Sequence, residues 1–247
     1  MNKIVTLEGR NTIHDAILSD KKVRRVFIAK ESADDPRIKE IISLADKKGV
    51  SINFIPAKEL KNKAESVNPQ NILAEMEIEE VSLKEVIEKN KNACILFFNR
   101  LDYEQNLGAI LRTAWGGGVD AIVVSPSGVH SLTPVVAKVS MGAVAYVPVI
   151  AESLFPQLKY LKDLGIPIVG VETGMGEAYF EQNLLGSVAF VFGGEDSGLS
   201  EPLKKYCDLF IHIPMNSSLS SLNVSVAVAI IVFEKLRQEL EAKNRGS

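Results

Sequence analysis

Apolar and polar positions along the first quarter of the chain alternate in blocks typical of a small α/β unit. The expected elements are a helix at 11–18, a strand at 23–29, a helix at 35–49 and a strand at 50–57. The second helix has clear end signals, since Asp34 or Asp35 can cap it, Pro36 opens it and Gly49 closes it.

A polar stretch at 65–80 follows this unit and contains a proline and an acidic cluster. Such composition favours a linker between domains. We therefore expect an N-terminal domain, with its linker, at 1–88 and a second domain at 89–247.

From residue 93 onward the apolar runs become longer and continuous, as in strands covered on both faces of a sheet. The expected strands are 93–99, 119–125, 166–172, 188–194 and 208–215, and the expected helices are 107–115, 153–165, 199–207 and 222–242. Strands that alternate with helices predict a mostly parallel sheet, and ligands of such sheets bind beyond the carboxyl ends of the strands.

The hydrophobic content of 46% suits one large or two modest globular domains. The longest apolar run, Val224 to Phe233, is shorter than the roughly 18 residues that a membrane span needs. The N-terminal segment MNKIVTLEGRN lacks the apolar core of a secretory signal. We expect a soluble, cytoplasmic protein without a membrane partner.

The formal net charge of −3 argues against a wholesale basic nucleic-acid binder but leaves room for a local basic patch. The cluster at 21–25, KKVRR, could be such a patch or simply a solvated turn. Cys94 and Cys207 are expected to be reduced and in or near the core, and the three histidines show no metal-ligand spacing, so no metal is expected.

Three polar loops follow predicted strands and are candidates for chemistry. In the first, Asn106 precedes or caps a helix that carries Arg112, and the alternative for Arg112 is a surface cation. In the second, Gly193, Gly194 and Glu195 offer backbone freedom and exposed N–H groups, or form an ordinary strand-to-helix turn.

The third loop, at 216–225, is crowded with serine and asparagine before an apolar helix, although one such residue suffices as a cap. The excess favours a backbone that wraps a polar ligand, and the alternative is close packing of the small serines against a neighbouring helix. A competing signal is VETGMGE at 171–177, which resembles the glycine-rich opening of Rossmann-like methyltransferases and would place Gly174 and Gly176 at a cofactor.

Taken together and in this order, the three loops resemble the motifs of the SpoU/TrmH family of SPOUT RNA ribose 2′-O-methyltransferases. The matching segments are NLGAILRTA at 106–114, FGGEDSGLS at 192–200, and IPM at 213–215 through SLNVS at 221–225, with KVSMGA at 138–143 between the first two. The N-terminal third is similar to the substrate-binding domain of ribosomal-protein-like fold found in rRNA-directed members.

The resemblance implies an α/β fold with a deep trefoil knot in the C-terminal domain, a homodimer, and S-adenosylmethionine as cofactor. It implies cofactor contacts from the backbone of Gly193, Ile213 and Leu222. It implies a catalytic set that comprises Asn106, Arg112, Glu195, Ser221 and Asn223. The implied partner is RNA, with rRNA favoured over tRNA because of the N-terminal domain, and 23S rRNA guanosine as the expected target. The alternative is a non-catalytic RNA-binding or ribosome-assembly factor on the same fold.

Overall fold

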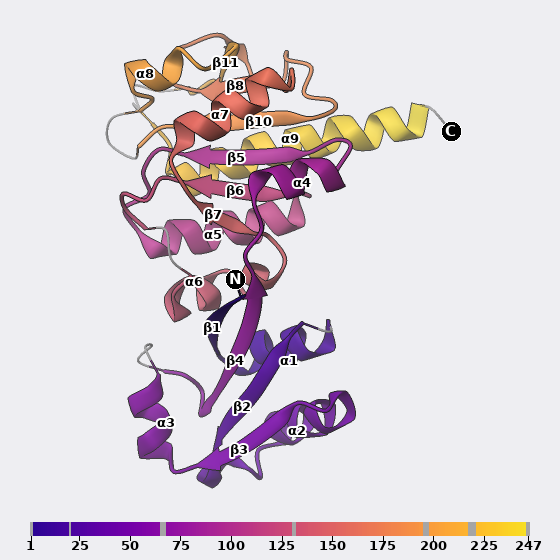
Figure 1. Cartoon of the computed structure of the whole chain (residues 1–247), viewed down its shortest axis with the longest axis vertical. Helices are drawn as coiled ribbons and strands as arrows, with labels where there is room; N and C mark the ends of the chain where they lie inside the picture. The colour runs from indigo at the N-terminus through magenta and orange to yellow at the C-terminus, as the bar shows by residue number, and fades with distance from the viewer. Residues whose placement is uncertain are drawn as a thin grey trace. The chain divides into compact units, whose positions relative to one another are not determined.

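The computed structural model of the chain describes residues 2–19, 21–64, 68–129, 132–194, 198–216 and 221–245. Its contacts divide the chain into two compact units. The N-terminal unit comprises residues 1–80 together with 132–146, and the C-terminal unit comprises residues 81–131 together with 147–247 (Figure 1).

The N-terminal unit is built on a four-stranded sheet in the order β1-β4-β2-β3. Its strands are β1 (Asn2–Glu8), β2 (Val23–Ala29), β3 (Ser51–Ile55) and β4 (Ile72–Glu79). β4 runs antiparallel to both of its neighbours, while β2 and β3 are parallel. The unit's first helices are α1 (Arg10–Leu18), α2 (Pro36–Lys48) and α3 (Ala57–Lys63), with a short 3-10 turn η1 at Lys30–Ser32.

The end signals of α2 are confirmed. Asp35 is the N-cap, and its carboxylate accepts hydrogen bonds from the backbone N–H of Arg37 and Ile38. Pro36 is the first helical residue, and Gly49 ends the helix in the left-handed conformation at φ 68°.

The polar stretch at 65–80, expected to be a linker, instead contributes β4 to the interior of the sheet. Its acidic residues alternate with apolar ones, so Ala74 and Met76 are buried on one face while Glu75 and Glu77 lie on the other. The acidic cluster is therefore one face of an amphipathic strand.

Residues 132–146 belong with the N-terminal unit although they follow β6 of the C-terminal sheet. They form α6 (Pro134–Val139) and a 3-10 turn η2 (Ala143–Ala145), and α6 packs against β1. Val136 and Ala137 are fully buried there, and Lys138 donates a hydrogen bond from Nζ to the backbone oxygen of Asn68 at 3.3 Å.

The C-terminal unit contains a seven-stranded sheet, all parallel, in the order β7-β6-β5-β10-β8-β11-β9. Its strands are β5 (Cys94–Phe98), β6 (Ala121–Val124), β7 (Val149–Ala151), β8 (Ile168–Val171), β9 (Glu177–Ala178), β10 (Val188–Phe192) and β11 (Leu209–His212). The predicted mostly parallel sheet is confirmed.

Helices of the C-terminal unit cover both faces of this sheet, which explains why β5 and β10 are buried along their whole length. The helices are α4 (Leu83–Lys89), α5 (Glu104–Gly116), α7 (Leu154–Asp163), α8 (Glu201–Lys204) and α9 (Val224–Arg245). Apolar residues of α4, α7 and α8 form one core cluster with the sheet, while α5 and α9 pack against each other.

The trefoil knot implied by the resemblance depends on the paths of the second and third loops. Residues 195–197 and 217–220 of these loops lie outside the described residues, so the knot stays a prediction. In the part of the chain that the structure describes, no helix is long and apolar enough to cross a membrane.

Both cysteines are free, as expected, with Cys94 buried and Cys207 partly buried. Burial raises the pKa of the Cys94 thiol to about 12 and that of the Cys207 thiol to about 11. Both thiols are therefore protonated and unreactive near neutral pH.

Candidate active site

A pocket of about 530 Å³ lies where β8, β10 and β11 end, at the carboxyl edge of the parallel sheet. Its size is within the range of small-molecule and cofactor sites. The lining residues are Val171, Glu172, Thr173, Phe192, Gly193, Gly194, Gly198, Ile213, Met215, Ser221, Leu222, Asn223, Val224 and Ala227.

The three residues predicted to contact the cofactor, Gly193, Ile213 and Leu222, all line this pocket. Gly193 follows directly after β10, and a Cβ atom built on it would overlap the backbone of Gly198. The absence of a side chain at Gly193 thus lets two backbone segments meet and keeps the floor of the pocket open.

Of the predicted catalytic residues, Ser221 and Asn223 line the same pocket. Asn223 precedes α9 and caps it, because its Oδ1 accepts the backbone N–H of Ser225 at 2.9 Å and the Ser225 hydroxyl at 2.7 Å. The other end of its side chain reaches a second helix, as Nδ2 donates to Oδ1 of Asn106 at 3.2 Å.

Asn106 and Arg112 both lie on α5, which begins earlier than the sequence suggests, at Glu104. Six helical residues turn the chain by about 600°, which leaves the two side chains roughly 120° apart in direction. Asn106 is buried, whereas Arg112 is exposed and makes no ion pair or hydrogen bond through its guanidinium in the described part of the chain. The pocket lining does not include Arg112.

Glu195, the remaining predicted catalytic residue, lies outside the described residues, together with 196 and 197. The residues on either side of this segment, Gly194 and Gly198, form an antiparallel β-bridge. The backbone N–H of each donates to the carbonyl of the other at 3.1 Å.

The glycines of VETGMGE do not line the pocket, which overturns the Rossmann-like interpretation. Gly176 allows close approach of backbones instead, because a Cβ on it would overlap the carbonyl of Phe210. Besides Val171 at the end of β8, Glu172 and Thr173 of the segment line the pocket, and these two polar residues were not among the predicted site residues. Their only sequence signal is their position directly after an apolar strand.

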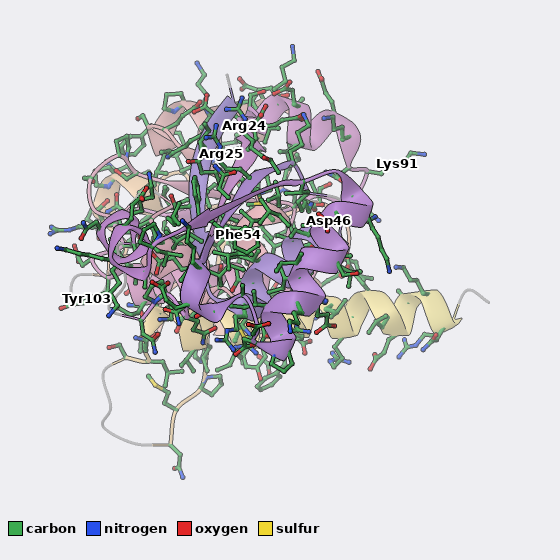
Figure 2. The ribbon with its side chains drawn as sticks, turned by 90° about the horizontal axis from the view of Figure 1, so that it is seen from below. Arg24, Arg25, Asp46, Phe54, Lys91 and Tyr103 are labelled. Carbon is green, nitrogen blue, oxygen red and sulfur yellow. The ribbon has the colours of Figure 1, made fainter. Side chains whose placement is uncertain are left out.

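The basic cluster at 21–25 is largely occupied by partners within its own unit. On β2, Arg25 pairs with Glu75 at 3.1 Å and Arg24 with Glu77 at 3.7 Å, and Lys22 pairs with Glu79 (Figure 2 labels the two arginines). Because carboxylates offset these charges, the cluster is a weaker RNA-steering patch than its sequence suggests.

Lys21 of the same cluster stands over the ring of Tyr146, with Nζ 4.0 Å from the ring centroid. Burial lowers its pKa. Within the described residues, no group of three or more His, Cys, Asp or Glu side chains is arranged to hold a metal ion.

A pocket at the carboxyl edge of a parallel α/β sheet is where proteins of this class bind their ligands. Comparison with known families specifies the class further. Residues 93–233 match the model of the SpoU rRNA methylase family, and residues 6–81 match that of the RNA 2′-O ribose methyltransferase substrate-binding domain. The chain belongs to the SpoU rRNA methylase family.

Its curated relatives include two enzymes described as 23S rRNA (guanosine-2′-O-)-methyltransferase RlmB. The one from Pasteurella multocida is 34% identical over 232 residues, which cover 91% of this chain and 95% of the relative. The one from Vibrio vulnificus is 33% identical over 232 residues, which cover 91% and 94%.

Among solved structures, an RNA 2′-O ribose methyltransferase is 28% identical, with a TM-score of 0.80 over 96% of this chain and 89% of that one. AviRb from Streptomyces viridochromogenes, solved with S-adenosylmethionine, has the same fold at 22% identity, with a TM-score of 0.81 over 95% and 90%. The chain is an RNA ribose 2′-O-methyltransferase.

The pocket fits S-adenosylmethionine. Gly193 brings backbone to the pocket, the partly exposed apolar residues Ile213 and Leu222 suit a purine, and Glu172 gives a carboxylate for a ligand of net positive charge. These are the groups expected in a site for an adenosine derivative.

Proposed function

We propose that this protein methylates the ribose 2′-hydroxyl of a guanosine in 23S rRNA. Its similarity over nine-tenths of its length to two RlmB enzymes supports the target. The junction of Asn106 and Asn223 at the pocket supports the chemistry, because it joins two of the predicted motifs at one point. The place of action is then the cytoplasm, where ribosomes are assembled.

S-adenosylmethionine supplies a methyl group activated by a sulfonium. In our account the backbone of Gly193, Ile213 and Leu222 holds this cofactor, and the amides of Asn106 and Asn223 orient the attacking hydroxyl. Ser221 lines the same pocket and serves as a further polar contact, while Glu195 orients the second loop.

Arg112 acts as a phosphate clamp rather than a base. A guanidinium stays protonated at neutral pH, so it is a poor proton acceptor. It is, however, a rigid fork of donors that matches the oxygens of a phosphate beside the target ribose. Arg112 is exposed and has no partner among the described residues, which leaves it available to RNA. The hydroxyl proton then leaves through water or the phosphate.

We assign RNA recognition to the N-terminal domain at 1–88. The match of residues 6–81 to a substrate-binding model supports this assignment. The boundary after residue 88 stays a prediction.

We also propose a homodimer formed through α5 and α9. Trp115, Val226 and Phe233 are large apolar side chains of these two helices and are exposed by 46%, 47% and 48%, and exposed apolar side chains that gather on one surface mark an interaction site. A Cβ on Gly116 would lie 3.7 Å from the ring of Phe233, so the two helices share this face. Arg112 is three residues before Trp115 and so lies on the same side of α5, next to a second copy.

Light scattering tests the dimer. Phe233→Asp should give a monomer. Phe180→Asp is the control, because it makes the same change at a side chain that is 53% exposed away from α5 and α9, and this variant should remain a dimer. A wild-type monomer would contradict the proposal.

Mapping of ribose methylation in 23S rRNA from cells with and without the gene tests the target. We expect one guanosine to lose its 2′-O-methyl group in the deletion strain and to regain it with the wild-type gene. An unchanged 23S map, with a lost site in tRNA, would move the target to tRNA.

A further inference from the structure

Glu172 stands at the carboxyl end of β8 and lines the pocket. Of the described residues that line it, Glu172 has the only charged side chain. An isolated carboxylate at the wall of a small-molecule site either stabilises the protein or accepts hydrogen bonds from the ligand.

The carboxylate is fixed in place by the second loop. Its Oε2 accepts the backbone N–H of Leu199 at 2.7 Å. A Cβ on Gly198 would lie 2.6 Å from its Oε1, so only glycine fits beneath it, and Gly198 has φ +62°. Since a carboxylate has about four acceptor sites, one backbone donor leaves most of its capacity for a ligand.

The sheet order places this carboxylate away from the reacting methyl group. β8 is two strands from β5, with β10 between them, and neighbouring strands are about 4.8 Å apart. The helix that follows β5 carries Asn106, which marks the methyl-transfer end in the proposed function. Glu172 thus follows a strand that is two strand spacings, roughly 10 Å, from the strand that leads to Asn106, on the side that we assign to the cofactor's nucleoside.

The nucleoside offers a carboxylate two kinds of donor, the exocyclic amine of adenine and the two adjacent hydroxyls of its ribose, and only the hydroxyls place separate donors on neighbouring carbons. The apolar lining from Ile213 and Leu222 is better suited to the purine face. We propose that Glu172 accepts hydrogen bonds from the ribose hydroxyls of the bound cofactor. This inference rests on the proposed function, because the proposed function places the reacting methyl group of the cofactor near Asn106.

Calorimetric titration of the full-length protein with S-adenosylhomocysteine and its 2′-deoxy and 3′-deoxy analogues tests this. In the wild type, loss of a hydroxyl that binds Glu172 should weaken binding by about tenfold or more, as for hydrogen bonds to charged groups. In Glu172→Gln the parent compound should bind about tenfold more weakly, and the deoxy analogues should lose little further affinity.

Glu181→Gln is the matched control, since Glu181 is an exposed acid of the segment that follows β9 and does not line the pocket. It should show the wild-type penalty for each analogue. In Glu172→Gln the side-chain oxygen of the new glutamine can still accept the backbone N–H of Leu199, so an unchanged melting temperature is expected.

The same deoxy penalty in Glu172→Gln as in the wild type would overturn the inference, as would the absence of any penalty in the wild type. Either result with tight wild-type binding of S-adenosylhomocysteine would leave the proposed function standing. No wild-type binding would contradict both.

Discussion

Asn223 donates its side-chain amide to Asn106 at 3.2 Å and, with the opposite end of the same side chain, caps α9. One residue therefore joins the loop that lines the pocket to the helix that carries Arg112. This explains why a helix bound for the core begins with asparagine and serine, since its first turn is part of the pocket.

The two roles of Asn223 can be separated by substitution. Asn223→Asp keeps the cap, because aspartate is as good an N-cap as asparagine, but it cannot donate to Asn106. We expect a melting temperature that is lowered less than in Asn223→Ala, because the cap is kept while Oδ1 of Asn106 loses this donor, and a methyl-transfer rate lower by about tenfold or more. Asn223→Ala should lose activity and also about 1 kcal/mol of stability. Full activity of the aspartate variant would show that the amide contact is dispensable.

Gly193→Ala should weaken cofactor binding by about 10- to 100-fold, the effect of forcing a methyl group into packed backbone. Gly165→Ala is the control: Gly165 has φ +70° and open space around it, so it should lose some stability and retain the wild-type dissociation constant. Titration calorimetry measures both. Equal affinities for the two variants would contradict the role assigned to Gly193.

Arg112→Lys should lose most methyl-transfer activity, by about 10- to 100-fold, because lysine cannot hold a phosphate with two parallel hydrogen bonds. Cofactor affinity should barely change, since Arg112 does not line the pocket. Arg245→Lys, at the exposed end of α9, controls for loss of an arginine elsewhere. Normal turnover in Arg112→Lys would exclude the clamp.

Deletion of residues 1–80, which leaves α4 and its core residues Leu83 and Val86 in place, should preserve cofactor binding and abolish methylation of RNA. It also removes β1, against which α6 packs, and so exposes Val136 and Ala137. We therefore expect trypsin to cleave the truncated protein rapidly after Lys138, while the full-length protein resists there. Undiminished RNA methylation by the truncated protein would remove the N-terminal domain from recognition.

Much of the C-terminal fold could be predicted because its strands are continuous apolar runs. β4 was missed although its pattern was readable, since Glu75 and Glu77 alternate with Ala74 and Met76 at the period of a strand. What the sequence does not contain is the pairing of those glutamates with the arginines of β2, about 50 residues away.

The candidate site was likewise only partly predictable from the sequence. Gly193, Ile213 and Asn223 were predictable from ordered motifs, and the structure brings them to one pocket. Glu172 was not, because a single acid after a strand is common and becomes informative only when sheet order places it beside Gly198. The direction of Arg112 likewise depends on where α5 begins.

Methylation of RNA is measured by the transfer of labelled methyl from S-adenosylmethionine by the purified protein, with unmodified rRNA and tRNA offered separately. We predict label at one ribose 2′-O position of 23S rRNA and none in tRNA. Cofactor binding without label in either RNA would point to an assembling ribosomal particle as substrate, in place of free rRNA. The absence of both label and cofactor binding would contradict the account and favour a non-catalytic RNA-binding factor.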